Sequence, residues 1–391
     1  MNRSAIPVDL PTKVYLEITT DCNLDCGMCV RHSWEEPGGS MDARTFNNLL
    51  AHIRDTPSIR TVNFSGFGEP TEHPRFFDFL EQVKHAGLTA EVVTNGLNLD
   101  EPAARRMVDL RLDKLIVSLD EPRPSENRFF HEVEYHNVDL SKTAFPKADS
   151  EPSVHGSLRG LYQMKIFEER SLPEVCVEFV ATKRNIHQLP LLRRMGRDLG
   201  FASILVTNLV PYTAEMAHDI LYDHWTTAAA NTKRSPWMPE IDLPRLDLRG
   251  PAMPVFEELA TSGGRLMVNG ENVVGGGMYC RFVNEGFMAI TPGGDVTPCL
   301  PLLHTYTYFF RNRHRRSKTH RVGNVNHRSL DEIWSDPEYQ AFRHRVSEFS
   351  FSPCIDCGGC DLRDSNEKDC YNNPFPTCGE CLWAAGLVQC P

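Results

Sequence analysis

The sequence predicts an α/β protein whose first half forms a parallel sheet and whose last third is rich in cysteine. Over the first two hundred residues, short apolar runs rich in β-branched residues alternate with amphipathic segments. Nine of the 13 cysteines fall between Cys280 and Cys390. Alternating strands and helices are joined by right-handed crossovers, which makes the sheet parallel. We therefore expect a partial (β/α)6, TIM-like barrel with functional loops at the carboxyl ends of its strands, followed by a Cys-rich domain.

Six segments have the length and composition of strands. They are 14–19, 61–65, 90–94, 115–118, 175–181 and 203–207. The amphipathic segments predicted as helices are 42–54, 74–86, 101–110, 158–170 and 189–199. Residues 121–154 are polar, contain prolines and show no clear period, so we expect an irregular insertion there, either inert or a lid over the substrate.

Three regions follow from this pattern. The barrel is predicted to cover residues 1–210, a linking segment of helix and loop 211–266, and the Cys-rich domain 267–391. The last region has few long apolar runs, so we expect its bound metal to hold it together.

Composition narrows the class of protein. The 391 residues carry a net charge of −11, which argues against a general nucleic-acid or membrane-surface partner. No run of apolar residues is long enough to span a bilayer, and the first twenty residues lack the apolar core of an export signal. We therefore expect a cytoplasmic protein. A secreted disulfide framework fits poorly, because cysteines separated by two or three residues suit metal ligation instead.

Cys22, Cys26 and Cys29 follow directly on the first predicted strand. Three thiolates on one loop can hold three irons of a four-iron cluster and leave the fourth iron open to a small-molecule ligand. A zinc site completed by a distant histidine is the alternative that this spacing leaves open.

Glycine and polar residues follow the later strands at the same face of the barrel. They are Gly66, Gly68, Glu69 and Pro70, then Thr94 and Asn95, then Ser118 and Asp120, and finally Asn208. Glycine lets a ligand approach the backbone closely. A carboxylate such as Glu69 can accept a hydrogen bond from an ammonium group, and Ser118 and Asp120 can reach ribose hydroxyls. This grouping around one cysteine loop favours a cofactor site over zinc.

The Cys-x3-Cys-x2-Cys loop, followed by Gly-Glu-Pro after the second strand, resembles the radical S-adenosylmethionine (SAM) superfamily. The resemblance implies that Cys22, Cys26 and Cys29 ligate a [4Fe-4S] cluster and that Gly68 and Glu69 contact the SAM ammonium. It implies reductive cleavage of SAM to a 5′-deoxyadenosyl radical. It also implies anaerobic function and a reductant such as ferredoxin or flavodoxin.

The later cysteines resemble the SPASM auxiliary-cluster domain. The pattern consists of a Gly-x4-Cys element ending at Cys299, a Gly-Asn-Val element at 323–325 and a Cys-x2-Cys pair. It implies one or two auxiliary [4Fe-4S] clusters with ligands among Cys280, Cys299, Cys354, Cys357, Cys360, Cys370, Cys378, Cys381 and Cys390. Nine thiols suffice for two such clusters with one spare, and the spacing after Cys360 leaves their division open. A zinc ribbon is the alternative, with Cys354 and Cys357 facing Cys378 and Cys381.

Longer segments resemble the radical maturases that accompany tungsten-cofactor aldehyde oxidoreductases. They are 16–21, 29–34, 66–74, 178–186, 207–213 and 376–391. This resemblance implies that the chain modifies a tungsten-dependent oxidoreductase or its pterin cofactor. One alternative is a radical SAM enzyme that crosslinks or oxidises a peptide. A second alternative is a cysteine-rich metal-binding scaffold without catalytic activity.

Overall fold

The computed structural model describes residues 9–120, 154–222, 278–352, 354–355 and 360–390, and the backbone of 240–243, 265–268 and 271–272. All six predicted barrel strands are present: β1 (Lys13–Leu16), β2 (Thr61–Phe64), β3 (Thr89–Thr94), β4 (Lys114–Ser118), β5 (Glu174–Ala181) and β6 (Ser203–Asn208). The helices between them are α1 (Ala43–Asp55), α2 (Phe76–His85), α3 (Glu101–Asp109), α4 (Val154–Phe167) and α5 (Leu189–Leu199). Neighbouring strands pair in parallel throughout, which confirms the predicted α/β partial barrel.

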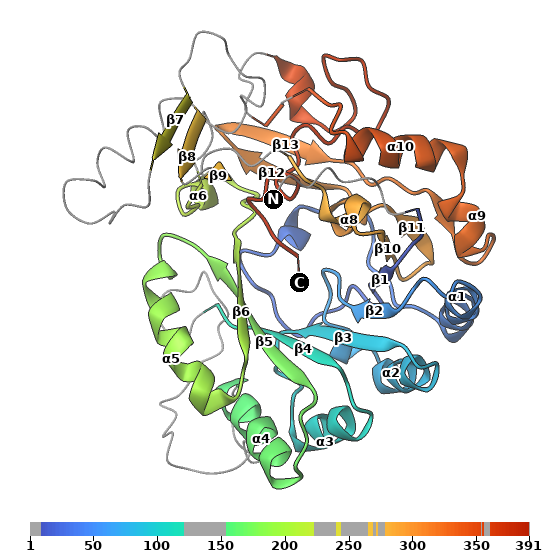
Figure 1. Cartoon of the computed structure of the whole chain (residues 1–391), viewed down its shortest axis with the longest axis vertical. Helices are drawn as coiled ribbons and strands as arrows, with labels where there is room; N and C mark the ends of the chain where they lie inside the picture. The colour runs from blue at the N-terminus through green and yellow to red at the C-terminus, as the bar shows by residue number, and fades with distance from the viewer. Residues whose placement is uncertain are drawn as a thin grey trace.

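The helices cover the outer side of the curved sheet (Figure 1). Helix α1 shows why its sequence folds in this way. Asp42 caps its first turn by accepting a hydrogen bond of 2.7 Å from the Thr45 amide. Its buried apolar residues Phe46, Leu49, Leu50 and Ile53 recur at helical spacing and enter the main core.

The sheet extends beyond the six predicted strands. Strands β10 (Phe287–Ile290), β11 (Asp295–Thr297) and β14 (Gly323–Asn324) continue it past β1, in the order β14-β11-β10-β1-β2-β3-β4-β5-β6. Strand β10 pairs in parallel with β1, and every residue of both strands is buried. Backbone hydrogen bonds therefore join the Cys-rich region to the barrel. The predicted domain limit at residue 267 stays a prediction.

Between the barrel and these added strands, the linking segment differs from its prediction of helix and loop. It contains the short helix α6 (Ala214–Ala217), strand β7 (Glu240–Leu243) and the first part of strand β8 (Arg265–Val268). Strand β7 pairs with β8, and β9 (Glu271–Asn272) pairs with β8 on its other side. Strands of two to four residues are too short for a periodic signal, so the sequence pattern missed them. Of the insertion predicted at 121–154, only Val154 is described, and it begins α4.

The remaining C-terminal elements belong to the Cys-rich region. They are α8 (Arg281–Asn284), β12 (Tyr306–Phe310), β13 (Arg313–Ser317), α9 (Leu330–Trp334) and α10 (Pro337–Ser347), with short 3-10 turns between them. Strands β12 and β13 form a separate hairpin. None of the helices in the described ranges has the length and apolar character needed to cross a bilayer.

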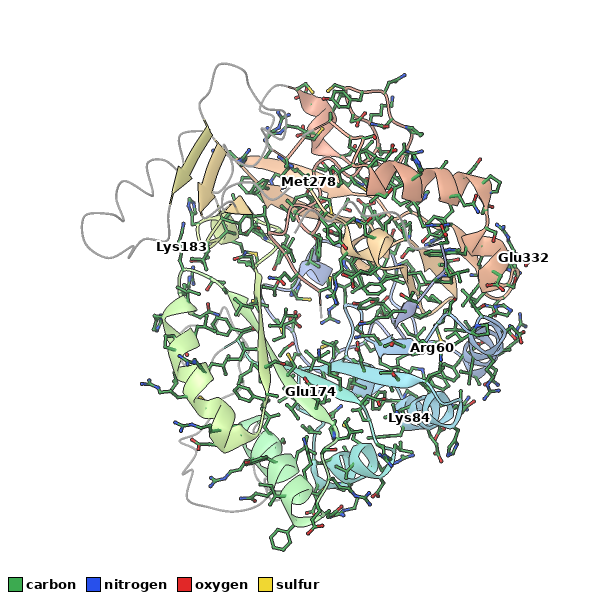
Figure 2. All side chains as sticks on the ribbon, in the orientation of Figure 1. Arg60, Lys84, Glu174, Lys183, Met278 and Glu332 are labelled. Atoms are coloured by element: carbon green, nitrogen blue, oxygen red, sulfur yellow. The ribbon has the colours of Figure 1, made fainter. Side chains whose placement is uncertain are left out.

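The end of the chain returns to the barrel beside β6. Thr207 Oγ1 donates to the Gln389 carbonyl at 3.1 Å and accepts from the Gln389 amide at 2.8 Å. Asn208 Nδ2 donates to the Leu387 carbonyl at 2.7 Å. Figure 1 shows the C-terminus inside the arc of strands. In Figure 2, Glu174 marks the start of β5 and Lys183 lies just beyond its end. The tail lies along β6, the strand next to β5. The tail therefore forms part of the wall of the barrel.

Candidate active site

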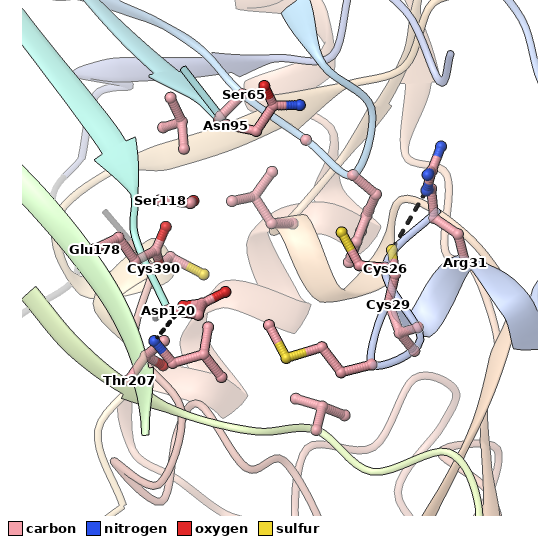
Figure 3. A pocket seen from close by; sticks show the side chains of 18 of the residues that line it. Cys26, Cys29, Arg31, Ser65, Asn95, Ser118, Asp120, Glu178, Thr207 and Cys390 are labelled. Carbon is pink, nitrogen blue, oxygen red and sulfur yellow. Dashed lines mark hydrogen bonds between the residues drawn. The ribbon is translucent and has the colours of Figure 1, made fainter. Parts of the chain in front are cut away.

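A single cavity of about 320 Å³ gathers the predicted site residues at the carboxyl ends of the strands (Figure 3). Those that line it are Cys22, Cys26, Cys29, Gly66, Gly68, Glu69, Thr94, Asn95, Ser118, Asp120 and Asn208. Pro70 is the exception, because it is buried at the start of a 3-10 turn and does not line the cavity. The parallel sheet brings these distant residues together at one rim.

Arg31 holds the cysteine loop in place. Its Nε donates to Cys29 Sγ at 3.3 Å, and its two terminal nitrogens donate to the carbonyls of Thr20 and Leu24, each at 3.0 Å. From the other side of the loop, Tyr212 Oη donates to the Gly27 carbonyl at 2.6 Å. The guanidinium also places a positive charge beside thiols that must ionise to bind metal. The sequence pattern did not single out Arg31, although a basic residue two positions after Cys29 was the available signal.

Glu69 is the hub that ties the glycine loop to the end of β3. Its Oε1 accepts from Thr71 N at 3.1 Å, from Thr71 Oγ1 at 2.6 Å and from Thr94 Oγ1 at 2.8 Å. Its Oε2 accepts from Asn95 N at 2.7 Å. Burial raises the pKa of Glu69, and these hydrogen bonds oppose the rise. The carboxylate therefore positions the loop as well as lining the cavity, whereas the sequence suggested only a ligand contact.

The glycines allow a close approach of two backbone segments. A Cβ atom on Gly68 would lie 2.1 Å from the Thr19 carbonyl oxygen, which no side chain tolerates. Gly66 has a φ of +145° and packs on Glu17, whose Oε1 accepts from the Phe67 amide at 2.8 Å. Ser65, the residue before them, has a buried hydroxyl oxygen with no hydrogen-bond partner among the described residues. That orphaned hydroxyl lines the cavity and is available to a bound molecule.

The wall across from the cysteine loop is acidic and hydroxylic. Ser118, Asp120 and Glu178 lie on one side in Figure 3, and Cys26 and Cys29 lie on the other. Asp120 Oδ1 accepts from the Val180 amide at 2.8 Å. Burial, reinforced by the negative charge of Asp120, raises the pKa of Glu178 to about 8. Glu178 was missed because a residue inside a strand is ordinarily read as core.

Cys390 belongs to this wall too. The SPASM resemblance implies that Cys390 is an auxiliary-cluster ligand, and in the structure Cys390 lines the cavity together with Cys22, Cys26 and Cys29. Figure 3 shows it beside Glu178, across from the first cysteine loop. The amide of Asn208, which was predicted to bind cofactor, is engaged by the tail carbonyl of Leu387. Cys357 lies outside the described residues.

Comparison with known sequences agrees with this geometry. A model of the radical SAM superfamily matches residues 16–140, and a model of SPASM, an iron-sulfur cluster-binding domain, matches residues 280–361. The tungsten-containing aldehyde ferredoxin oxidoreductase cofactor-modifying protein of Pyrococcus furiosus is 31% identical over 389 residues, which cover 97% of this chain and 96% of that protein. This chain belongs to the radical SAM superfamily. It is a radical SAM enzyme with a C-terminal SPASM domain.

Two further relatives of this radical SAM enzyme extend over most of its length. The mycofactocin maturase of Mycobacterium ulcerans is 21% identical over 394 residues, covering 98% of this chain and 91% of that protein. The crystal structure of Streptococcus suis SuiB bound to SAM has a TM-score of 0.52 and 16% identity, covering 90% of this chain and 71% of that one. At that identity, the likeness to SuiB supports the fold alone.

The cofactors of the radical SAM enzyme are a [4Fe-4S] cluster and SAM, and its SPASM domain binds auxiliary iron-sulfur clusters. The cavity fits the [4Fe-4S] cluster together with SAM, because it is lined by three thiols, by Gly66 and Gly68, and by the unpartnered hydroxyl of Ser65. No group of three or more Cys, His, Asp or Glu side chains within the described ranges is arranged to hold a metal ion. The three thiols instead surround one end of a cavity that has room for a small molecule.

Proposed function

We propose that Cys22, Cys26 and Cys29 ligate the [4Fe-4S] cluster and that the rest of the cavity binds SAM. The observation that carries this proposal is that one cavity collects the three thiols and the polar ends of successive strands. The cluster and SAM supply a radical that abstracts hydrogen from a substrate. Pro70, being buried, acts through the loop that it begins.

In this proposal, the chain's own residues have separate tasks. Arg31 and Tyr212 fix the cysteine loop. Glu69 holds the Gly66–Gly68 segment against the end of β3, where Asn95 lies. Ser118 and Asp120 face the cysteine loop across the cavity, and their side chains can bind the ribose of SAM. The tail closes the gap beside β6 and limits the access of water.

The test of these roles is SAM cleavage by the anaerobically reconstituted protein with dithionite. We expect 5′-deoxyadenosine from the wild type and none from Cys26→Ala, because one iron then lacks its thiolate. Cys176→Ala is the matched control, since Cys176 is buried within β5 and does not line the cavity. Retention of cleavage by Cys26→Ala would contradict the ligand assignment. Stoichiometric zinc without iron in the purified protein would favour the scaffold alternative.

The proposed substrate is a tungsten-dependent oxidoreductase or its pterin cofactor. This proposal is supported by the near full-length similarity to the Pyrococcus furiosus protein whose name states that it modifies such a cofactor. The reductant we propose is ferredoxin or flavodoxin. The direct experiment incubates the reconstituted enzyme with deuterated partner oxidoreductase that still lacks the modification. We expect deuterium to appear in 5′-deoxyadenosine, and turnover without such transfer would count against this substrate.

Peptide modification is the second candidate. It is favoured by the similarity to the mycofactocin maturase along 98% of this chain. The discriminating observation is the coding sequence next to this gene. A tungsten oxidoreductase favours cofactor modification, whereas a short peptide reading frame favours a peptide crosslink or oxidation.

A further inference from the structure

A buried pair of side chains links the Gly66–Gly68 segment of the barrel to the Cys-rich region. Glu17 follows directly on β1, and its side chain is buried. Its Oε1 accepts a hydrogen bond of 2.8 Å from the amide of Phe67, in the middle of the segment. Its Oε2 lies 2.6 Å from Nε2 of His304, which is also buried. One carboxylate therefore joins the segment to a histidine that lies 287 positions later in the chain.

His304 lies just before β12, in the part of the chain that the SPASM model matches. Its imidazole stacks on the indole of Trp34, with ring centroids 3.9 Å apart and an angle of 17° between the planes. The imidazole also contacts the ring of Phe67 edge to face, at 5.9 Å between centroids. The two rings hold the imidazole in place, so that its Nε2 is directed at Glu17.

The backbone next to Trp34 is tied to the same part of the Cys-rich region. Trp34 and Tyr306 form an antiparallel bridge, and the Glu35 amide donates to the Thr305 carbonyl at 3.1 Å. This stretch continues directly from the cysteine loop. The residues around His304 therefore contact the continuations of both loops that line the cavity proposed to bind SAM, which we call the SAM cavity.

The shape of the Gly66–Gly68 segment depends on Glu17. A Cβ atom on Gly66 would lie 2.6 Å from Glu17 Cγ, and Phe67 lines the SAM cavity. A carboxylate can only accept hydrogen bonds, so Nε2 of His304 is the donor. A buried charge is stable only while it is paired and hydrogen-bonded. Without the imidazole, Glu17 would lose one of its partners and with it the position from which it holds the Phe67 amide.

We propose that His304 is a positioning residue for SAM binding. It orients Glu17, and Glu17 holds the Gly66–Gly68 segment in the conformation that binds the cofactor. The Cys-rich domain thus sets the SAM affinity of the barrel through a hydrogen bond. This role rests on the SAM site proposed above. Coupling between two sites is reciprocal, so bound SAM in turn stabilises the residues around His304.

Two substitutions separate the hydrogen bond of His304 from its ring contacts. His304→Phe keeps a ring against Trp34 and removes the donor, whereas His304→Gln keeps an N–H donor and removes the ring. SAM affinity is measured by equilibrium dialysis on the anaerobically reconstituted protein. We expect the dissociation constant to rise by about tenfold or more in His304→Phe, because a hydrogen bond to a charged group is lost. In His304→Gln it should stay within about twofold of the wild-type value, because the donor is kept.

Thr56→Val is the matched control, because it removes another hydrogen bond between the barrel and the Cys-rich region. Thr56 Oγ1 donates to Asp331 Oδ1 at 3.0 Å, and neither residue lines the SAM cavity. Its SAM affinity should equal that of the wild type. Unchanged affinity in His304→Phe, or an equal loss in His304→Gln, would overturn the positioning role alone. A wild-type protein that fails to bind SAM would overturn the SAM site itself, and the role of His304 with it.

Hydrogen exchange in the unaltered holoprotein gives a second readout that does not depend on the folding of a variant. The Thr305 amide donates to Glu36 Oε2 at 2.7 Å, and the Ser335 amide, at the end of α9, donates to the Asp331 carbonyl at 2.9 Å. We expect added SAM to slow exchange in the peptide that contains Thr305 and to leave the peptide that contains Ser335 unchanged. Absence of protection at Thr305, or equal protection of both peptides, would overturn the coupling.

Discussion

Replacing Glu69 by glutamine should loosen the glycine loop of the SAM site without unfolding the barrel. The carboxylate accepts four hydrogen bonds, three at Oε1 and one at Oε2. A glutamine can keep its oxygen at the Oε1 position. Its amide nitrogen then faces the Asn95 amide, which is also a donor, so the bond of 2.7 Å is lost.

The size of the effect follows from the bond that is lost. A hydrogen bond to a charged group contributes about 1.5–3 kcal/mol. A loss of about 2 kcal/mol corresponds to roughly a 30-fold change in a local equilibrium, since each 1.4 kcal/mol is tenfold. Hydrogen exchange at the Asn95 amide should therefore accelerate by about that factor. SAM affinity should fall with it, because Asn95 and Glu69 both line the cavity.

Hydrogen-exchange mass spectrometry on peptides that contain Asn95 measures this change. Glu72→Gln is the matched control on the same loop, since Glu72 accepts one exposed bond of 2.6 Å from Asn98. Unchanged exchange at Asn95 in Glu69→Gln would refute the hub role of Glu69. An equal acceleration in Glu72→Gln would show that the loop responds to any loss of charge.

Two further outcomes test the Gly66–Gly68 segment and the packing of the C-terminal region. Gly68→Ala should abolish SAM binding in equilibrium dialysis, because the new Cβ would lie 2.1 Å from a backbone carbonyl oxygen. Gly39→Ala is the control and should bind SAM normally, since the nearest atom to its new Cβ is 3.8 Å away. Equal affinities of the two variants for SAM would refute the role of the Gly66–Gly68 segment. Burial, together with the positive charge of Arg345, lowers the pKa of His320 from 6.5 to about 4. Below pH 6.5 this histidine is protonated in the unfolded chain but stays neutral in the folded chain. The free energy of unfolding therefore decreases as the pH is lowered from 6.5 to about 4. When the pH is lowered from 7 to 5, the free energy of unfolding of the wild type should therefore fall by about 1–2 kcal/mol more than that of His320→Phe, a range that allows for the partial exposure of the imidazole. Denaturation curves at the two pH values measure this difference, and an equal fall in both proteins would contradict the prediction.

Local pattern was sufficient to predict the barrel and most of its site. Each strand of the barrel is a short apolar run, and the carboxyl ends of parallel strands meet at one rim whatever their separation in the chain. The cysteine loop, Glu69 and Asp120 could therefore be assigned to one site before any contact was known. The structure places them around one cavity.

Other members of the site could not be read from the chain. Glu178 lies inside a strand, where the period of two does not say which face borders a cavity. The pairing of β10 with β1 joins residues more than 270 positions apart, and edge pairing depends on which edge is left open rather than on local sequence.

The sequence by itself determined the chemistry of this protein, because cysteine spacing and strand-end residues are local properties. Only the tertiary structure decided which cavity each of the C-terminal thiols lines. Cys378 and Cys381 line a second, smaller cavity with Cys299, while Cys390 lines the SAM cavity. The physical reason is the path of the tail, which is set by hydrogen bonds to Thr207 and Asn208 far away in the sequence.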